Sequence, residues 1–397
     1  MGLISQRLEA MEESATIAMA QKARELKSQG VDVISLSLGE PDFKTPDHIQ
    51  KAAKEAIDSG NYFAYPPVPG YPDLREAIAE KFTNENGIPS KAANVVVSTG
   101  AKQSLANIFM SIIDPGDEVI VLSPYWVSYA DLIQVAEGTP VLVKGTIEND
   151  FKATAKQVAE AITPKTKALI YSSPCNPTGS VFTYDELKEI AGVLKGTDII
   201  VIADEIYEHI NFTGKHVSIG SFPEMQNQTI TVNGVAKGFA MTGWRIGYIN
   251  APLPIAKACT KIQGQFTSGA NSIAQRATLA ALTQDMEPTK KMAAEYLRRR
   301  ELVHNLLVEI PGFKVNMPTG AFYFFPEIAS YFGTSYGDYK IETADDLCMY
   351  LLNEAHVSLV TGQAFGSPEC VRLSYAASEK DLKEAIQRIK VAVAKLS

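Results

Sequence analysis

The sequence predicts an α/β fold in which a large domain, built on a mostly parallel, doubly wound, seven-stranded sheet, is joined to a smaller α+β domain. A chain of 397 residues is long enough for two such domains. In its middle part, short runs rich in β-branched residues alternate with helical patterns, which is typical of a parallel sheet. Several of these runs are apolar on both faces, as strands covered by helices on each side must be.

The elements expected in the large domain follow this alternation in order. The strands are expected at 95–98, 118–122, 141–144, 168–171, 199–203, 229–232 and 246–249. The helices between them include 102–113, 154–161 and 184–194.

Beyond about Asp285 the pattern changes to that of the smaller domain. Its helices are expected around 296–307, at 344–354 and at 379–396, and its strands at 313–315, 321–325, 357–360 and 370–375. The first 45 residues, with a helix at 14–29 and a short strand, are expected to pack on this part. The predicted domains are therefore 46–285 and, discontinuously, 1–45 with 286–397, with a cleft between them.

Composition excludes several classes of function. A net charge of −8 argues against nucleic acid or an anionic membrane surface as a partner. The four cysteines have no C-x-x-C spacing and the five histidines no ligand spacing, so we expect neither a disulfide framework nor a metal site. There is no apolar run of membrane-spanning length and no secretory signal pattern. We therefore expect a cytoplasmic protein.

The strongest chemical signal is Lys237, which ends the small-residue stretch Gly-Val-Ala-Lys and is followed eight positions later by Arg245. Because the lysine comes soon after an apolar run, its amine should be partly desolvated and neutral often enough to form an imine. The planar, permanently charged arginine suits a phosphate. An imine-forming amine together with a phosphate site points to pyridoxal 5'-phosphate (PLP), and hence to an enzyme.

Asp204 and Tyr207 follow the strand expected at 199–203. Ligands of open α/β sheets collect at the carboxyl ends of strands, so an aspartate there could keep a pyridine nitrogen protonated. Tyr207, three residues on, could hydrogen-bond the ring hydroxyl. The alternative is that Asp204 only caps a helix that starts after the strand.

The segment Gly100-Ala101-Lys102 joins a strand to a helix. Its small residues leave backbone N–H groups free to face a phosphate at the helix N-terminus. Lys102 is unusual there, since a cation at the positive end of a helix dipole is mildly unfavourable. A solvated surface lysine is the alternative interpretation.

Three more side chains are candidates for the site. Trp126 follows the strand expected at 118–122 and could stack on a cofactor ring or simply fill the core. Asn176 is the strong hydrogen-bonding side chain of a turn made rigid by prolines. Arg372 lies within an apolar strand and needs a partner, which could be a substrate carboxylate or a structural acid.

Together these residues resemble the class I aminotransferases that depend on PLP, which have fold type I, and within them the bacterial branch of the aspartate aminotransferase family. The resemblance runs from Leu-Gly-Glu-Pro-Asp-Phe at 38–43 to 371–375, and the stretch 234–247 fits the class I signature throughout. The match to the bacterial branch rests on the segments 14–16, 100–103 and 123–129.

The resemblance implies a role for each residue of the cofactor site. Lys237 would hold PLP as an imine and move a proton between the substrate Cα and C4' of the cofactor. Asp204 would pair with the pyridine nitrogen, Tyr207 and Asn176 with the ring oxygen, and Trp126 would stack on the ring.

The phosphate of the cofactor would be bound, on the same resemblance, by Arg245 and by the backbone of Gly100, Ala101 and Lys102. Tyr65 would reach the phosphate of the neighbouring subunit, which implies a homodimer with shared active sites.

The resemblance also implies how the substrate is held. Arg372 would clamp its α-carboxylate, with help from the Gly39 backbone, while Lys102 and Thr16 are associated with a distal carboxylate. A charge-assisted hydrogen bond of roughly 1.5–3 kcal/mol gives about a ten- to hundredfold preference. The substrate-binding residues are expected to be Gly39, Trp126, Asn176, Arg372, Lys102 and Thr16.

The expected reaction is L-aspartate + 2-oxoglutarate ⇌ oxaloacetate + L-glutamate, by a ping-pong mechanism. A broader aminotransferase of the same fold, acting on prephenate or aromatic amino acids, is the alternative. Acidic residues at 11–13, Met-Glu-Glu, would disfavour a bulky dianion such as prephenate. A C–S lyase, a decarboxylase or a PLP-sensing regulator would share the cofactor residues, but the acidic balance and the early start of the aminotransferase pattern argue against a regulator that binds DNA.

Overall fold

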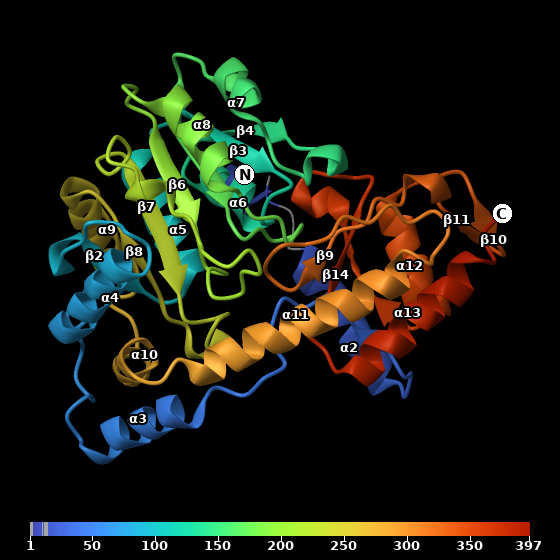
Figure 1. Ribbon diagram of the computed structural model, residues 1–397, viewed down its shortest axis with the longest axis horizontal. Helices are drawn as coiled ribbons and strands as arrows, with labels where there is room; N and C mark the ends of the chain where they lie inside the picture. Colours follow the sequence, from blue (N-terminus) through green and yellow to red (C-terminus); the bar gives the residue numbers. More distant parts are fainter. Residues whose placement is uncertain (1–2, 10, 12–14) are drawn as a thin grey trace.

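The computed structural model describes residues 3–9, 11 and 15–397. Within these residues, the larger part of the fold is a seven-stranded sheet with strand order β2-β8-β7-β6-β5-β3-β4 (Figure 1). Its strands are β2 (Val95–Ser98), β3 (Glu118–Ser123), β4 (Thr139–Lys144), β5 (Thr166–Ser172), β6 (Ile200–Asp204), β7 (Thr229–Gly234) and β8 (Gly247–Asn250).

Neighbouring strands of this sheet are parallel except at β8, which is antiparallel to both β7 and β2. All seven expected strands form, with ends that differ by one or two residues. The central strands are buried on both faces because helices cover both sides, so the alternating pattern of a half-exposed sheet is absent. The mostly parallel, doubly wound α/β fold is thus confirmed.

Apolar clusters fill both faces of the sheet. On one face the strands pack against α5, α6 and α9, and on the other against α7 and α8, with α3, α4 and α10 beside β2 and β8. The helices of this part are α3 (Asp47–Asp58), α4 (Pro72–Asn84), α5 (Ala101–Ile112), α6 (Ser128–Val135), α7 (Ala155–Ala161), α8 (Tyr184–Leu194), α9 (Leu253–Phe266) and α10 (Ser272–Thr283).

Another apolar cluster forms the core of the other part of the fold. It joins α2 near the N-terminus to the C-terminal helices, as expected for a discontinuous unit. Its helices are α2 (Ala15–Ser28), α11 (Glu287–Leu307), α12 (Ala344–Glu354) and α13 (Glu379–Val393), whereas the short α1 (Gln6–Glu9) lies against α6 of the main-sheet part and so departs from the expectation that the first 45 residues pack on this part. The strands are β1 (Ile34–Ser35), β9 (Tyr323–Phe324), β10 (Ser335–Tyr336), β11 (Tyr339–Lys340), β12 (Val357–Ser358), β13 (Val360–Thr361) and β14 (Val371–Ser374).

The sheets of this part are small. β13, β14 and β9 form an antiparallel sheet, and β1 pairs in parallel with β12, which ties residues 34–35 to 357–358. The strand expected at 313–315 does not form, because Lys314 makes only an isolated bridge to Glu327. Position 14, where the first long helix was expected to start, lies outside the described residues. The domain boundaries 46–285 and 286–397 stay a prediction.

The topology places the chemistry at one edge of the main sheet. From β3 the chain moves outward to β4 and then returns to β5 on the other side of β3, so the strand order reverses between β3 and β5. Crevices at such a switch point, outside the carboxyl ends of the strands, are where open α/β sheets bind ligands. The segments after β3, β5, β6 and β7 all leave the sheet at this edge.

Two further features concern the chain as a whole. Cys175, Cys259, Cys348 and Cys370 are buried free thiols. Among the helices of the described residues, none combines the length and the apolar character needed to cross a membrane.

Candidate active site

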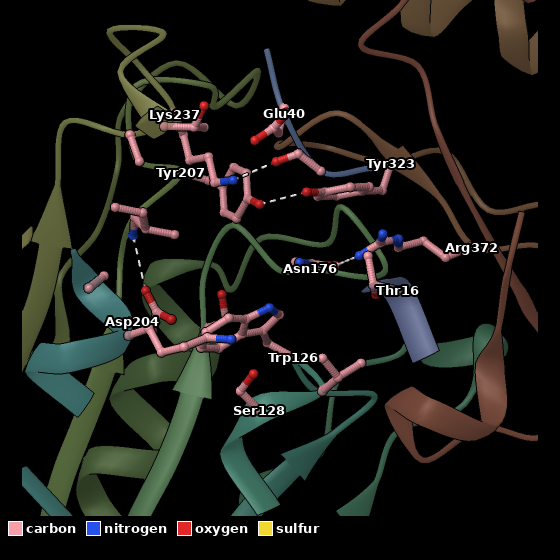
Figure 2. A pocket seen from close by; sticks show the side chains of 18 of the residues that line it. Thr16, Glu40, Trp126, Ser128, Asn176, Asp204, Tyr207, Lys237, Tyr323 and Arg372 are labelled. Carbon is pink, nitrogen blue, oxygen red and sulfur yellow. Dashed lines mark hydrogen bonds between the residues drawn. The ribbon is translucent and has the colours of Figure 1, made fainter. Parts of the chain in front are cut away.

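A cavity of about 470 Å³ opens at the carboxyl edge of the main sheet, where β9, β14 and α2 of the other part approach it (Figure 2). It gathers residues from segments that are far apart in the sequence. Of the residues predicted for the site, those lining it are Thr16, Gly39, Ala101, Lys102, Trp126, Asn176, Asp204, Tyr207, Lys237, Arg245 and Arg372.

Lys237 lies three residues after β7, and its ammonium donates to the carbonyl of Gly39 at 2.5 Å. Burial lowers the pKa of Lys237 to about 8, with Arg372 and Arg245 acting in the same direction and Glu40 and Asp204 opposing them. A neutral amine is therefore accessible near neutral pH, as a nucleophile or general base requires.

Asp204 ends β6, and its carboxylate is 4% exposed. One oxygen accepts a hydrogen bond from the Tyr129 hydroxyl at 2.6 Å, and the other accepts from the backbone N–H of Ile206 at 3.3 Å. Burial raises the pKa of Asp204 to about 6, although the Tyr129 hydrogen bond opposes the shift. Turns rather than a helix follow Asp204, so it is not a simple helix cap.

Tyr207 is held by a residue of the other part of the fold. Its hydroxyl lies 2.7 Å from the hydroxyl of Tyr323 on β9, and the Lys237 ammonium lies 5.7 Å from the centre of its ring (Figure 2). Tyr323 also touches Gly39, where an added Cβ would lie 2.3 Å from the tyrosine hydroxyl. Only glycine fits there, which brings the Gly39 carbonyl within reach of the lysine.

The N-terminus of α5 and Arg245 form a cationic cradle. Gly100 is the residue before the helix and has a φ of +85°, and a Cβ on it would lie 2.5 Å from Nη2 of Arg245. The space between the first N–H groups of the helix and the guanidinium therefore exists because residue 100 is glycine. Arg245 itself is left-handed (φ 59°), and its Nη1 donates to the Thr242 carbonyl at 2.9 Å. Free helix N–H groups beside a guanidinium suit a phosphate dianion.

Lys102 and Trp126 lie side by side at the cavity, with the Lys102 ammonium 4.9 Å from the centre of the indole ring. Desolvation and the charge of Arg245 lower the pKa of Lys102, while Asp131 opposes the shift. Trp126 is half-buried and packs edge-on against Tyr129. Thr16, on α2, lines the same cavity, and its hydroxyl is buried and has no hydrogen-bond partner among the described residues.

Arg372, on β14, is 2% exposed, yet no carboxylate of the described residues lies within salt-bridge distance of it. Nη1 donates to Asn176 Oδ1 at 2.9 Å and Nη2 to the Ser37 carbonyl at 2.5 Å, while Nε has no partner. The guanidinium also lies over the rings of Tyr323 and Phe365. A buried charge held only by neutral groups is suited to bind an external carboxylate.

Two predicted residues are not among those that line the cavity, Gly100, which adjoins it through Arg245, and Tyr65. Tyr65 is 92% exposed and is not among the lining residues. This is compatible with the expectation that it serves a neighbouring subunit.

Sequence reasoning missed two side chains that hold the site together, Tyr129 and Tyr323. Tyr129 lies within the motif 123–129 and one helical turn after Trp126, so its spacing was an available signal. Tyr323 lies in a strand that was expected, but nothing in the sequence indicated which face it would present.

Fold and site together define an α/β enzyme with a desolvated lysine, a buried aspartate and a cationic cradle at one cavity. The family model described as aminotransferase class I and II matches residues 31–389, and the chain belongs to this family.

Individual relatives align over nearly the full chain. Aspartate aminotransferase of Geobacillus stearothermophilus is 44% identical over 391 residues, covering 97% of this chain and 98% of that protein. The probable aspartate/prephenate aminotransferase of Rhizobium leguminosarum bv. phaseoli is 46% identical over 395 residues, covering 98% of each. The structure of aspartate aminotransferase from Thermus thermophilus with maleate superposes with a TM-score of 0.93 at 43% identity, covering 99% of this chain and 100% of that one. The resemblance inferred from the sequence is thereby confirmed, and the chain is a transaminase.

Proposed function

We propose that this enzyme is a PLP-dependent aspartate aminotransferase that catalyses L-aspartate + 2-oxoglutarate ⇌ oxaloacetate + L-glutamate by a ping-pong mechanism. The observation that carries the proposal is the buried Arg372, whose guanidinium faces the cavity without an acidic partner among the described residues. Lys102 faces the same cavity. Two cationic side chains on one cavity suit a substrate with two carboxylates.

The residues present fit PLP. The cradle between Gly100 and Arg245 would bind the phosphate, and Asp204 would accept a hydrogen bond from the protonated ring nitrogen. Lys237 would react with the aldehyde carbon. The raised pKa of Asp204 fits this assignment, because a buried carboxylate without a cationic partner is poised to accept one. When bound, PLP supplies an electron-poor ring that stabilises negative charge at the substrate Cα.

The protein groups then have distinct tasks. Arg372 and Asn176 would hold the α-carboxylate and so fix the orientation of the substrate Cα–H bond. Lys237, once its amine is free, would take the proton from the substrate Cα and return it at C4' of the cofactor. Its low pKa lets it act as a base near neutral pH. Tyr207, positioned by Tyr323, would donate to the ring oxygen.

The preference for a dicarboxylate is supported by Lys102 and Thr16. The Thr16 hydroxyl is a buried polar group without a partner among the described residues, and it would donate to the distal carboxylate together with the Lys102 ammonium. The related Thermus thermophilus enzyme has been solved with maleate, which is a dicarboxylate.

Prephenate is a second candidate substrate, favoured by the name of the Rhizobium leguminosarum relative. The acidic residues Glu12 and Glu13, on which the expectation against prephenate rests, lie outside the described residues.

We further propose a homodimer with shared active sites. Tyr65 and Phe63 are 92% and 72% exposed on one segment, as expected for side chains that a second subunit covers. A cytoplasmic location is proposed from the cysteines, which are all free thiols.

The experiment that tests the function is an absorption titration of the PLP-loaded protein with L-aspartate in the absence of an oxo acid. Conversion of the PLP band to the pyridoxamine form, reversed by 2-oxoglutarate, is the expected result. Phenylalanine and alanine serve as comparison substrates. A band that ignores aspartate and responds to phenylalanine would overturn the role of Lys102 but leave the chemistry in place. Absence of any band after PLP addition would overturn the role of Lys237.

A further inference from the structure

The loop that begins with Asp204 has two sides with different surroundings. Asp204 and Tyr207 line the cavity, whereas Glu205 and Glu208 belong to a buried polar cluster that does not line it. Glu205 is 0% exposed and Glu208 is 7% exposed. The position of both cofactor-site residues therefore depends on how the other side of this loop is held.

The buried cluster holds the loop through several hydrogen bonds. Asn86 Nδ2 donates to Glu208 Oε2 at 2.7 Å and to Glu205 Oε2 at 3.1 Å. The Ser218 hydroxyl donates to Glu205 Oε2 at 2.6 Å, and Lys81 of α4 forms an ion pair with Glu208. Each contact reaches the loop from a segment that belongs to the main sheet part of the fold.

His216 completes the charge balance of this cluster. Its Nε2 lies 2.9 Å from Glu205 Oε2, and its side chain is 10% exposed. The groups that face the His216 imidazole are Glu205, Glu208 and Lys81. At the edge of the cluster, Glu85 lies 3.2 Å from His209, which in turn lies 3.8 Å from Glu208. The two buried carboxylates, Glu205 and Glu208, face one buried ammonium, that of Lys81, so a protonated His216 adds a second cation on the Glu205 side of the cluster.

We propose that His216 is a positioning residue for the cofactor site, which in its cationic form balances Glu205 and Glu208 and thereby fixes the loop that carries Asp204 and Tyr207. The inference rests on the proposed PLP site. It adds a residue outside the cavity that controls how well the loop carrying Asp204 and Tyr207 is ordered in the apoenzyme.

The sign of the pH dependence follows from the surroundings of His216. Burial lowers its pKa, but the attraction of Glu205, with a smaller contribution from Glu208, outweighs burial and raises the pKa above the usual 6.5. A histidine with a raised pKa in the folded state stabilises that state fully below its unfolded pKa, and this contribution disappears as the pH rises through the folded pKa. The loop should therefore be best ordered at pH 6–6.5 and looser at pH 9.

The test compares PLP binding by the apoenzymes of the native chain and of His216→Gln, followed by the visible circular dichroism of bound PLP. The variant is expected to have an about tenfold higher Kd at pH 6.5, and the difference in Kd between the two chains is expected to shrink as the pH rises to 9 and the native imidazole loses its proton. His304→Gln, the same change at a half-buried histidine beside Phe324, is the matched control and should follow the native profile. A Kd ratio for His216→Gln that is close to one, or that does not change with pH, would overturn the proposal.

A second measurement keeps this inference separable from the proposed function. Hydrogen–deuterium exchange of the segment 204–209 in the apoenzyme, corrected for the intrinsic effect of pH, requires no cofactor. Protection is expected to fall from pH 6.5 to pH 9 in the native chain and to be low at both values in His216→Gln. Equal protection of this segment in the native chain and in His216→Gln would overturn the proposal for His216, even if PLP binds. If PLP does not bind but the exchange changes as expected, the proposed function fails and the proposal for His216 holds.

A second variant guards against a folding defect. Ser218→Ala removes one hydrogen bond to Glu205 without changing any charge. It is expected to weaken PLP binding while keeping the pH profile of the native chain. If the Kd of Ser218→Ala for PLP no longer depended on pH, the pH dependence of the native chain could not be assigned to His216.

Discussion

Replacing Arg372 by lysine is expected to lower kcat/KM for every amino-acid substrate by about ten- to a hundredfold. In the structure the guanidinium donates one hydrogen bond to Asn176 and one to the Ser37 carbonyl, and its Nε–H has no partner among the described residues. The donors that remain allow a two-point contact with a carboxylate. Each charge-assisted hydrogen bond contributes about 1.5–3 kcal/mol, and a lysine keeps the charge but loses one of the two. That loss corresponds to the stated factor.

Arg372→Gln removes both bonds and the charge, so the expected loss is about 3–6 kcal/mol, or roughly a hundred- to ten-thousandfold. The assay measures kcat/KM for L-aspartate, L-glutamate and L-phenylalanine, with oxo-acid product followed spectrophotometrically. Because all three substrates carry an α-carboxylate, the factor should be similar for each. A loss confined to aspartate and glutamate would refute the reasoning, since Arg372 would then bind the distal carboxylate. Thermal unfolding of each variant confirms that the assayed protein is folded.

The remaining predictions concern three other groups of the cavity. Lys102→Ala should lower kcat/KM for aspartate by about ten- to a hundredfold and leave phenylalanine within about threefold, and equal losses for both would contradict its role. Asp204→Asn should raise the free energy of unfolding of the apoenzyme at pH 7 by up to about 3 kcal/mol, because burial raises the pKa of Asp204 to about 6 and so penalises its charged form. This gain should shrink as the pH falls from about 6 to 4, as urea unfolding at each pH would show, and a gain that persists at pH 4 would exclude this origin. The rate of PLP capture by the apoenzyme should rise with pH up to about 8, the pKa to which burial lowers Lys237, and then level off. A stopped-flow rate that keeps rising to pH 10 would show an unperturbed amine.

Much of the fold could be predicted because its signals are local. A strand that is buried on both faces is mostly apolar along its length, and the runs that became β5 and β6 show this in the sequence itself. β7 is buried as well, although Thr229 and Thr231 alternate with its apolar residues. Strand ends were less predictable, because they depend on partners. β6 includes Asp204, since its neighbours in β5 and β7 continue the ladder that far. The segment at 313–315 has the composition of a strand but meets only one bridging partner.

The site could be predicted as far as its chemistry requires particular residue types at particular distances from strand ends. Lys237, Asp204 and Arg372 line one cavity. Tyr323 could not be predicted, because its contact with Tyr207 joins residues 116 positions apart across two parts of the fold. Contacts of this kind depend on tertiary packing, which the hydrophobic periodicity of a sequence does not indicate.

The same limit applies to the charges behind the site. Glu205 and Glu208 follow Asp204 in a stretch that looks like an ordinary polar turn, and nothing local says that both are buried. Their burial depends on Lys81 and Asn86, more than a hundred residues away, and on the nearby His216. In a buried polar network every side chain needs hydrogen-bonding or charged partners, so the burial of one member cannot be predicted without knowing the others.

The burial of Cys175, Cys259, Cys348 and Cys370 has a practical consequence for labelling experiments. Desolvation raises the pKa of all four thiols, to about 11 for Cys175 and Cys259, so little reactive thiolate exists at pH 7. A cysteine introduced in place of the exposed Val391, on α13 of the other part of the fold, would thus be the natural attachment point for a maleimide dye on an otherwise unreactive background. Its emission could report subunit exchange in real time, without the need to remove any native residue of the interior.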